Sequence, residues 1–154
     1  MSRRDQIKMT PAEVRDFLAV ERVAAVASIG PDGRPHLAPL WYVPEADGFA
    51  TWTYGASQKV ANLRRLPQAT ALIEAGTSYE ELRGVSLECD VEIVEDTERI
   101  TAIGAAITER YTESPEVAAS ASQFLRAQAV KRVGLVFTPT KVVSWDHRKL
   151  GGTY

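Results

Sequence analysis

The stretch from Val85 to Ile93 alternates strictly between apolar and polar side chains. Its apolar members are Val85, Leu87, Cys89, Val91 and Ile93, and its polar members are Ser86, Glu88, Asp90 and Glu92. A period of two is that of a β-strand with one buried and one solvated face. This stretch therefore predicts a sheet that covers a core with one of its faces.

Further strands are predicted on both sides of this one. They run over residues 23–29, 34–43, 49–54, 69–74 and 132–145, the last of them bent at Pro139. Gly-Pro-Asp-Gly at 30–33 and Glu-Ala-Asp-Gly at 45–48 are turn sequences, which makes the first three strands consecutive hairpins. Pro35 and Pro39 lack the N–H that a ladder needs, so the strand over 34–43 is expected at an edge or a bulge.

Helices are predicted at three places around these strands. Thr10, Pro11 and Glu13 form an N-cap, an N1 proline and a capping-box partner for a helix with an apolar face. Two more helical segments run from Thr97 to Tyr111 and from Pro115 to Val130, as a helical hairpin or as one broken helix. We therefore predict a mainly β (α+β) fold, a six-stranded antiparallel barrel with peripheral helices. Residues 1–154 suit a single domain.

Composition excludes several classes of function. A formal net charge of −2 gives no basic field for nucleic acid, and no run approaches the roughly 20 apolar residues of a membrane span. Cys89 stands alone, and the first residues do not resemble a signal peptide, so we expect a cytoplasmic protein. His36 and His147 are too few and too far apart for a metal site. Neither Gly-x-Ser-x-Gly nor Gly-x-Gly-x-x-Gly is present.

The segment from Tyr54 to Pro67 holds the strongest candidate for a binding site. It is predicted to be a strand end, a turn at Gly55 and a short helix capped by the side chain of Ser57. Lys59 falls in the first turn, where the helix dipole places roughly half a positive charge and favours acidic residues. Free N–H groups with Ser57, Gln58 and Lys59 form a candidate phosphate-binding corner. The alternative is an ordinary solvated lysine.

Two further expectations concern the neighbours of this corner. Side chains spaced three apart on one side of the helix are predicted to face outward, and those on the other side to face the core. The outward set is Lys59, Asn62 and Arg65, and the inward set is Val60, Leu63 and Leu66. Trp41, Trp52 and Trp145 are either core aromatics or walls for a flat ligand.

These segments resemble a known family. The hairpin from Gly30 to Trp41, the stretch Gly55–Pro67 and the sequence Leu82-Arg-Gly-Val resemble the flavin-binding split barrels related to pyridoxamine 5′-phosphate oxidase. Within these, the pattern resembles the flavin and deazaflavin oxidoreductases common in actinobacteria. The resemblance implies a split β-barrel and a homodimer with two equivalent cofactor sites at the subunit interface, each using residues from both chains.

The resemblance also implies roles for particular residues. The cofactor phosphate would be held by Ser57, Gln58, Lys59 and Asn62. The ring system would be lined by Pro39, Leu40, Trp41, Trp52 and Thr53. Trp145 and His147 would approach from the partner subunit. No side chain is obligatory as a catalyst, because the cofactor carries the chemistry.

Two departures narrow the expected activity. Pyridoxamine phosphate oxidases carry more arginine around the phosphate and end in an arginine-containing motif, whereas this chain has Gln58 and ends Lys-Leu-Gly-Gly-Thr-Tyr. The phosphate segment here, which has fewer arginines, resembles that of family members that bind coenzyme F420. We therefore expect a reductase that passes a hydride from reduced F420 to a small conjugated molecule. The alternatives are an FMN-dependent oxidase or reductase of the same fold, and a non-catalytic carrier of a flavin or tetrapyrrole.

Overall fold

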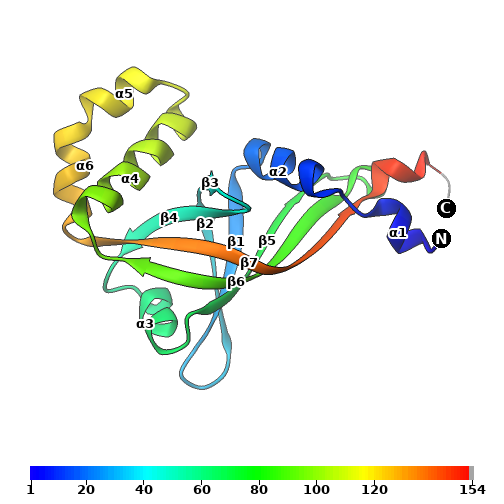
Figure 1. The fold of residues 1–154 in the computed structure, drawn as a ribbon, viewed down its shortest axis with the longest axis horizontal. Helices are drawn as coiled ribbons and strands as arrows, with labels where there is room; N and C mark the ends of the chain where they lie inside the picture. The colour runs from blue at the N-terminus through cyan, green and yellow to red at the C-terminus, as the bar shows by residue number, and fades with distance from the viewer. Residues whose placement is uncertain (153–154) are drawn as a thin grey trace.

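A computed structural model describes residues 1–152 and contains one curled antiparallel sheet with helices around it (Figure 1). Its seven strands lie in the order β2-β1-β5-β6-β7-β4-β3. In chain order they are β1 (Val23–Ile29), β2 (Pro35–Trp41), β3 (Val43–Glu45), β4 (Gly48–Tyr54), β5 (Gln68–Ala75), β6 (Arg83–Val94) and β7 (Arg132–Asp146). The alternating stretch from Val85 to Ile93 is the middle of β6, and β6 pairs with strands on both sides.

The sheet has seven strands where the sequence predicted six, because the predicted strand over 34–43 is divided at Tyr42. β2 and β3 lie at the two opposite edges of the sheet, so the chain crosses from one edge to the other at this residue. The Tyr42 side chain points into the core and is fully buried. This crossing closes the sheet covalently into a split barrel, and it confirms the edge position that Pro35 and Pro39 predicted for β2.

Two short helices cover the core inside the curled sheet. α2 (Pro11–Val20) begins with the predicted capping box of Thr10 and Glu13 and contributes Phe17 and Leu18 to the main core. α3 (Gln58–Arg65) contributes Val60 and Leu63 to the same core. In the view of Figure 1, α2 lies above the strands and α3 lies below them.

The predicted helical region after β6 is a helical hairpin. α4 (Thr97–Thr112) is one arm, α5 (Pro115–Ser120) and α6 (Ser122–Ala129) are the other, and α6 returns alongside α4 (Figure 1). The second predicted helix is thus interrupted at Ala121, which leaves the regular helical conformation. Ile103 and Ile107 of α4 pack on Ala50 of β4, on the face of the sheet opposite the main core.

The remaining elements lie at the far end of the molecule. α1 (Arg3–Ile7), which was not predicted from the sequence, packs beside η2 (His147–Leu150), and η1 (Tyr79–Glu81) also contacts η2.

The predicted bend of the last strand at Pro139 is a β-bulge. Thr140 is the extra residue of β7, unpaired between the partners of Glu88 and Cys89 in β6. Cys89 is buried, which raises the pKa of its thiol to about 12. None of the helices within residues 1–152 is long and apolar enough to cross a bilayer.

Candidate functional site

The split in the barrel leaves two strand edges without a ladder partner among the described residues. β2 pairs only with β1, and the part of β4 beyond Ala50 pairs only with β7. The hydroxyl of Thr51 donates to the carbonyl of Trp41 at 2.6 Å and so joins the two edges at one point. Backbone groups along these edges remain available to a ligand. The helix α3 follows directly from the end of β4.

Lys59 of α3 turns toward this strand end. Its ammonium donates to the hydroxyl oxygen of Thr53, 3.2 Å away. Within residues 1–152 it forms no ion pair, and partial burial lowers the pKa of its ammonium. A half-buried cation without a carboxylate is poorly compensated. Lys59 was expected at the surface, but it is partly buried beside Thr53.

Ser57 precedes α3 and carries a second uncompensated group. Its hydroxyl oxygen is buried without a hydrogen-bond partner among the described residues. The predicted side-chain cap was wrong, because the N–H of Val60 bonds to the main-chain carbonyl of Ser57, 3.1 Å away. A buried hydroxyl without a partner calls for an explanation. An anion held between this hydroxyl and the Lys59 ammonium would supply one.

Asn62 does not face outward as the helix pattern predicted. Its side chain is fully buried beneath α3, where its amide nitrogen donates to the hydroxyl of Ser28 at 3.1 Å. Gln58 donates in turn to the amide oxygen of Asn62 at 2.9 Å. The predicted inward residue Leu66 is instead partly exposed, because it lies after the last turn of α3. Asn62 thus fastens α3 to β1 rather than facing a ligand.

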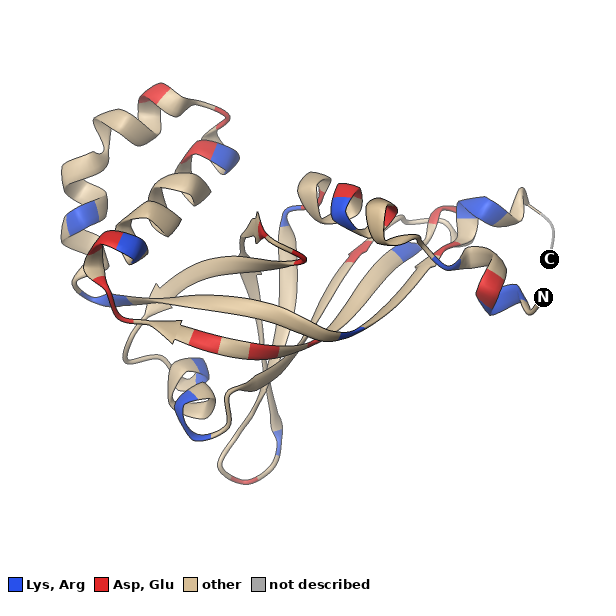
Figure 2. Ribbon diagram, viewed as in Figure 1, with Lys and Arg blue, Asp and Glu red and all other residues tan. Residues whose placement is uncertain are grey.

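The other cations of α3 are already engaged. Figure 2 shows basic residues gathered on this helix and at the start of β7. Arg64 forms an ion pair with Glu95 at 2.7 Å, and Arg65 donates to the carbonyl of Ile29. Among the cations of α3, Lys59 alone has neither a carboxylate nor a carbonyl as a partner within residues 1–152. α3 therefore offers the corner one cation that no carboxylate or carbonyl engages, and Arg132 of β7 stacks over Tyr54 nearby.

The residues expected to line a ring system divide between the faces of the sheet. On β2, Leu40 packs against the core, whereas Pro39 and Trp41 lie on the opposite, outer face. The Trp41 side chain is 58% exposed and stacks on Tyr111 of α4. Tyr111 was missed by sequence reasoning, because no local pattern indicates that the end of α4 returns to β2.

Thr53 and Trp52 are neighbours in β4 and so point to opposite faces. Thr53 lies beside Lys59, whereas Trp52 packs against Gly104 of α4. The guanidinium of Arg132 stacks over the ring of Trp52 at 4.4 Å. Trp52 therefore belongs to the contact between the sheet and α4, and Thr53 to the Lys59 corner. Alternation from Thr53 would have indicated Thr51 as a further residue of the inner face.

Trp145 and His147 lie far from this corner within one chain. Thr53 of the corner pairs with Val133 of β7, whereas Trp145 lies 12 residues farther along the same strand, up to roughly 40 Å at about 3.3 Å per residue. Trp145 lies against Gly84 of β6, and His147 Nδ1 is 2.9 Å from the carbonyl oxygen of Tyr79. One chain brings together the residues around Lys59 but not these two.

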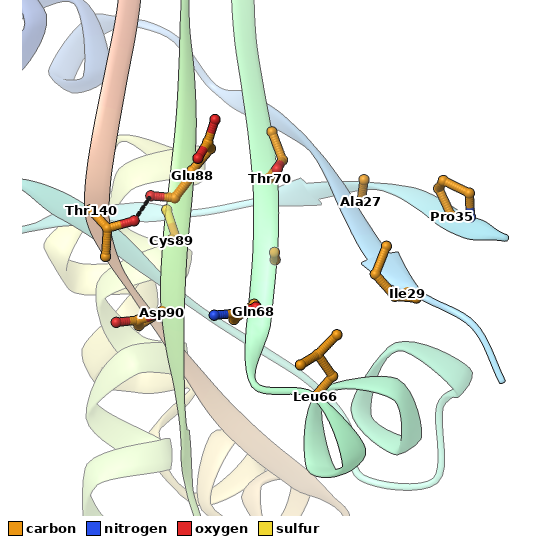
Figure 3. Close-up of a pocket in the computed structure, with 11 residues that line it drawn as sticks. Ala27, Ile29, Pro35, Leu66, Gln68, Thr70, Glu88, Cys89, Asp90 and Thr140 are labelled. Carbon is orange, nitrogen blue, oxygen red and sulfur yellow. Dashed lines mark hydrogen bonds between the residues drawn. The ribbon is translucent and has the colours of Figure 1, made fainter. Parts of the chain in front are cut away.

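A hollow of about 380 Å³ opens on the outer face of the sheet (Figure 3). Ile29 and Leu66 line it, and so do Glu88 and Asp90. Carboxylates in the lining do not suit a phosphate. No group of three or more His, Cys, Asp or Glu side chains within residues 1–152 is arranged to hold a metal ion.

The fold and this corner define a class: a split barrel with a candidate anion site beside its open edge. The chain belongs to the pyridoxamine 5′-phosphate oxidase family, whose sequence model matches residues 10–146. The expected membership of the flavin-binding split barrels is thereby confirmed.

Solved structures agree with this assignment. The conserved hypothetical protein Rv2991 from Mycobacterium tuberculosis is 39% identical, with a TM-score of 0.89 over 100% of this chain and 95% of that one. An F420 reductase is 20% identical, with a TM-score of 0.65 over 83% of this chain and 94% of its own. The haem storage protein HutZ from Vibrio cholerae is 17% identical, with a TM-score of 0.65 over 86% of this chain and 93% of its own. No curated protein matches the chain.

Proposed function

We propose that this protein is a coenzyme F420-dependent reductase that acts on a small conjugated organic substrate. The observation that carries the proposal is the partly buried ammonium of Lys59, which has a hydroxyl partner but no carboxylate and lies on the same helix start as the unpartnered Ser57 hydroxyl. Both groups fit a phosphate oxygen. The F420 reductase that shares the fold supports the choice of cofactor.

The charge of the corner favours F420 over FMN. FMN carries a phosphate monoester, with about −1.5 to −2 charge at pH 7, as other monoesters do. F420 carries its phosphate as a diester, with a single negative charge. Because Arg64 and Arg65 are engaged elsewhere, Lys59 is the cation of α3 available to the ligand. One ammonium neutralises a monoanion but leaves a dianion with excess negative charge, which costs free energy to bury.

The residues of this chain would bind and orient the cofactor. Lys59, Ser57 and the hydroxyl of Thr53 would hold the phosphate, and Gln58 would flank it. The free backbone edges of β2 and β4 would hydrogen-bond the ring edge, with Pro39 and Trp41 beside it. When bound and reduced, the deazaflavin supplies a hydride, and the substrate also takes up a proton. We place this activity in the cytoplasm.

We further propose a homodimer formed through the outer face of the sheet. Pro39, Ala25, Leu72, Ser86 and Val143 lie in one row across five strands of this face. Trp41 lies two residues beyond one end of this row and Trp145 two residues beyond the other. A two-fold related copy would bring its own Trp145 and His147 to the Trp41 end, which completes the ring site from two chains.

Cofactor titration tests the proposal. The purified dimer is titrated with F420 and with FMN by fluorescence, and Lys59→Ala is compared with Arg64→Ala, whose cation is engaged by Glu95. We expect tighter binding of F420 than of FMN and at least about a tenfold loss of F420 affinity in Lys59→Ala alone, as for removal of a charge-assisted hydrogen bond. Tight FMN with no F420 binding would overturn the choice of cofactor.

Turnover separates the enzyme from a carrier. Oxidation of reduced F420 is followed in the presence of quinones, enones, nitroaromatics and biliverdin. Acceleration by at least one acceptor is expected for a reductase. Binding of F420 without oxidation by any acceptor would favour the carrier.

A further inference from the structure

Tyr111 lies in the last turn of α4 and stacks on Trp41 of β2, 70 positions earlier in the sequence. The ring centroids are 4.4 Å apart, and the planes differ by 11°. The indole of Trp41 nevertheless remains 58% exposed. Tyr111 therefore covers one part of the indole and leaves the rest open.

The Tyr111 ring is itself fixed by polar contacts with the point where the chain crosses between sheet edges. The N–H of Tyr42 donates to the Tyr111 hydroxyl at 3.0 Å, and this hydroxyl donates to the carbonyl of Arg22. The neighbouring Arg110 donates to the carbonyl of Tyr42 at 3.0 Å. The end of α4 thus satisfies backbone groups that β2 and β3 leave without a ladder partner.

A tryptophan on an exposed sheet edge would ordinarily change rotamer freely. Its immobilisation costs conformational entropy, and stacking on Tyr111 meets that cost before any ligand arrives. Two apolar residues border the open indole: Val23 pairs with Trp41 across the ladder, and Pro39 lies on the same face. This surface suits an uncharged, planar, conjugated ring.

We propose that Tyr111 is a positioning residue that holds the Trp41 indole as a preformed platform for the ring of the bound molecule. The inference rests on the proposed function, since Trp41 there borders the cofactor ring. It adds that the helical hairpin α4–α6 controls ring affinity although none of its residues belongs to the phosphate corner. Phosphate affinity and ring affinity then depend on different residues, Lys59 and Tyr111.

Two probes separate these contributions. F420 carries both phosphate and ring, whereas its phosphate-free deazariboflavin fragment carries the ring alone. Tyr111→Leu removes the hydroxyl and the aromatic ring, and Tyr111→Phe removes the hydroxyl but keeps the ring. We expect Tyr111→Leu to weaken both probes by the same factor, about 2- to 10-fold as for an aromatic pair. Tyr111→Phe should stay within about twofold of the wild type, because its ring can still stack. Lys59→Ala should weaken F420 alone.

The position of the indole can be read without a ligand. The chain has three tryptophans, so 5-fluorotryptophan labelling gives three ¹⁹F resonances, and Trp41→Phe assigns one of them. We expect Tyr111→Leu to shift the Trp41 resonance and to leave those of Trp52 and Trp145 in place. An unmoved Trp41 resonance, or equal ring affinity in Tyr111→Leu and Tyr111→Phe, overturns the positioning role while leaving F420 binding intact. A wild-type protein that binds neither probe overturns the proposed function, and the platform with it.

Discussion

The amide nitrogen of Asn62 donates to the hydroxyl of Ser28 at 3.1 Å, and the two side chains are 0% and 1% exposed. This bond joins α3 to β1 across 34 positions of the sequence. It sets the rotation of α3 about its axis, which in turn directs Lys59 toward Thr53. Asn62 thus contributes to the candidate site through the orientation of its helix.

Replacement of Asn62 tests this role. Asn62→Ala should lower the free energy of unfolding by about 2 kcal/mol, because it leaves the buried Ser28 hydroxyl without its partner. Gln58→Ala is the matched control, since it removes the other hydrogen bond of Asn62 from an exposed position and should cost less than about 1 kcal/mol. Urea denaturation measures both. Equal decreases in the free energy of unfolding would mean that the buried bond to Ser28 stabilises the protein no more than the bond to Gln58 does.

The ammonium of Lys59 should reduce stability in the absence of a ligand. Burial lowers its pKa from the usual 10.5, so between the lowered pKa and 10.5 the unfolded chain binds more protons than the folded one. The penalty is therefore complete below the lowered pKa and disappears as the pH rises toward 10.5. We expect Lys59→Met to unfold at higher urea than the wild type at pH 7, and the difference to shrink as the pH rises toward 10.5. A variant less stable at pH 7 would contradict this.

Residues whose role depends on local pattern could be predicted from the sequence. The alternation from Val85 to Ile93, the capping box at Thr10 and the edge position of the proline-containing strand all depend on neighbours in the chain, and the structure confirms each of them. The unusual position of Lys59 could also be recognised from neighbouring residues, because it required only a predicted helix start and a cation in its first turn. Burial of that cation, in contrast, depends on the strand that precedes it.

Other features depend on contacts between distant segments, and these the sequence could not indicate. Tyr42 divides a predicted strand because its backbone finds partners on Arg110 and Tyr111 of α4. Asn62 was expected outside because helical spacing alone does not reveal the buried hydroxyl of Ser28. Trp52 was placed beside Thr53, although strand alternation alone assigns adjacent residues to opposite faces. The first two features could be learned only from the folded structure, whereas the third error could have been avoided from the sequence alone.

Gly104 of α4 allows Trp52 to pack against the helix. A Cβ at this position would lie 2.5 Å from the indole ring, closer than packed atoms tolerate. Gly104→Ala should therefore displace Trp52 and cost about 1–3 kcal/mol despite the better helix propensity of alanine. Gly55→Ala is the control, because the nearest side-chain atom there is 3.6 Å away. Thermal unfolding compares the two, and the ¹⁹F resonance of Trp52 should move in Gly104→Ala alone.

Leu37 of β2 lies on the outer face of the sheet, which we assign to the subunit interface. Its side chain is 69% exposed in the isolated chain, comparable to Phe124 at 64%, which belongs to α6 of the helical hairpin and not to a strand. Leu37→Lys would bury a charge between two copies and should weaken association by several kcal/mol, because both copies carry it. Phe124→Lys should leave association unchanged. Sedimentation analysis over a range of concentrations distinguishes them: a monomeric Leu37→Lys beside a dimeric Phe124→Lys is expected, and the reverse pattern would assign the interface to the hairpin instead.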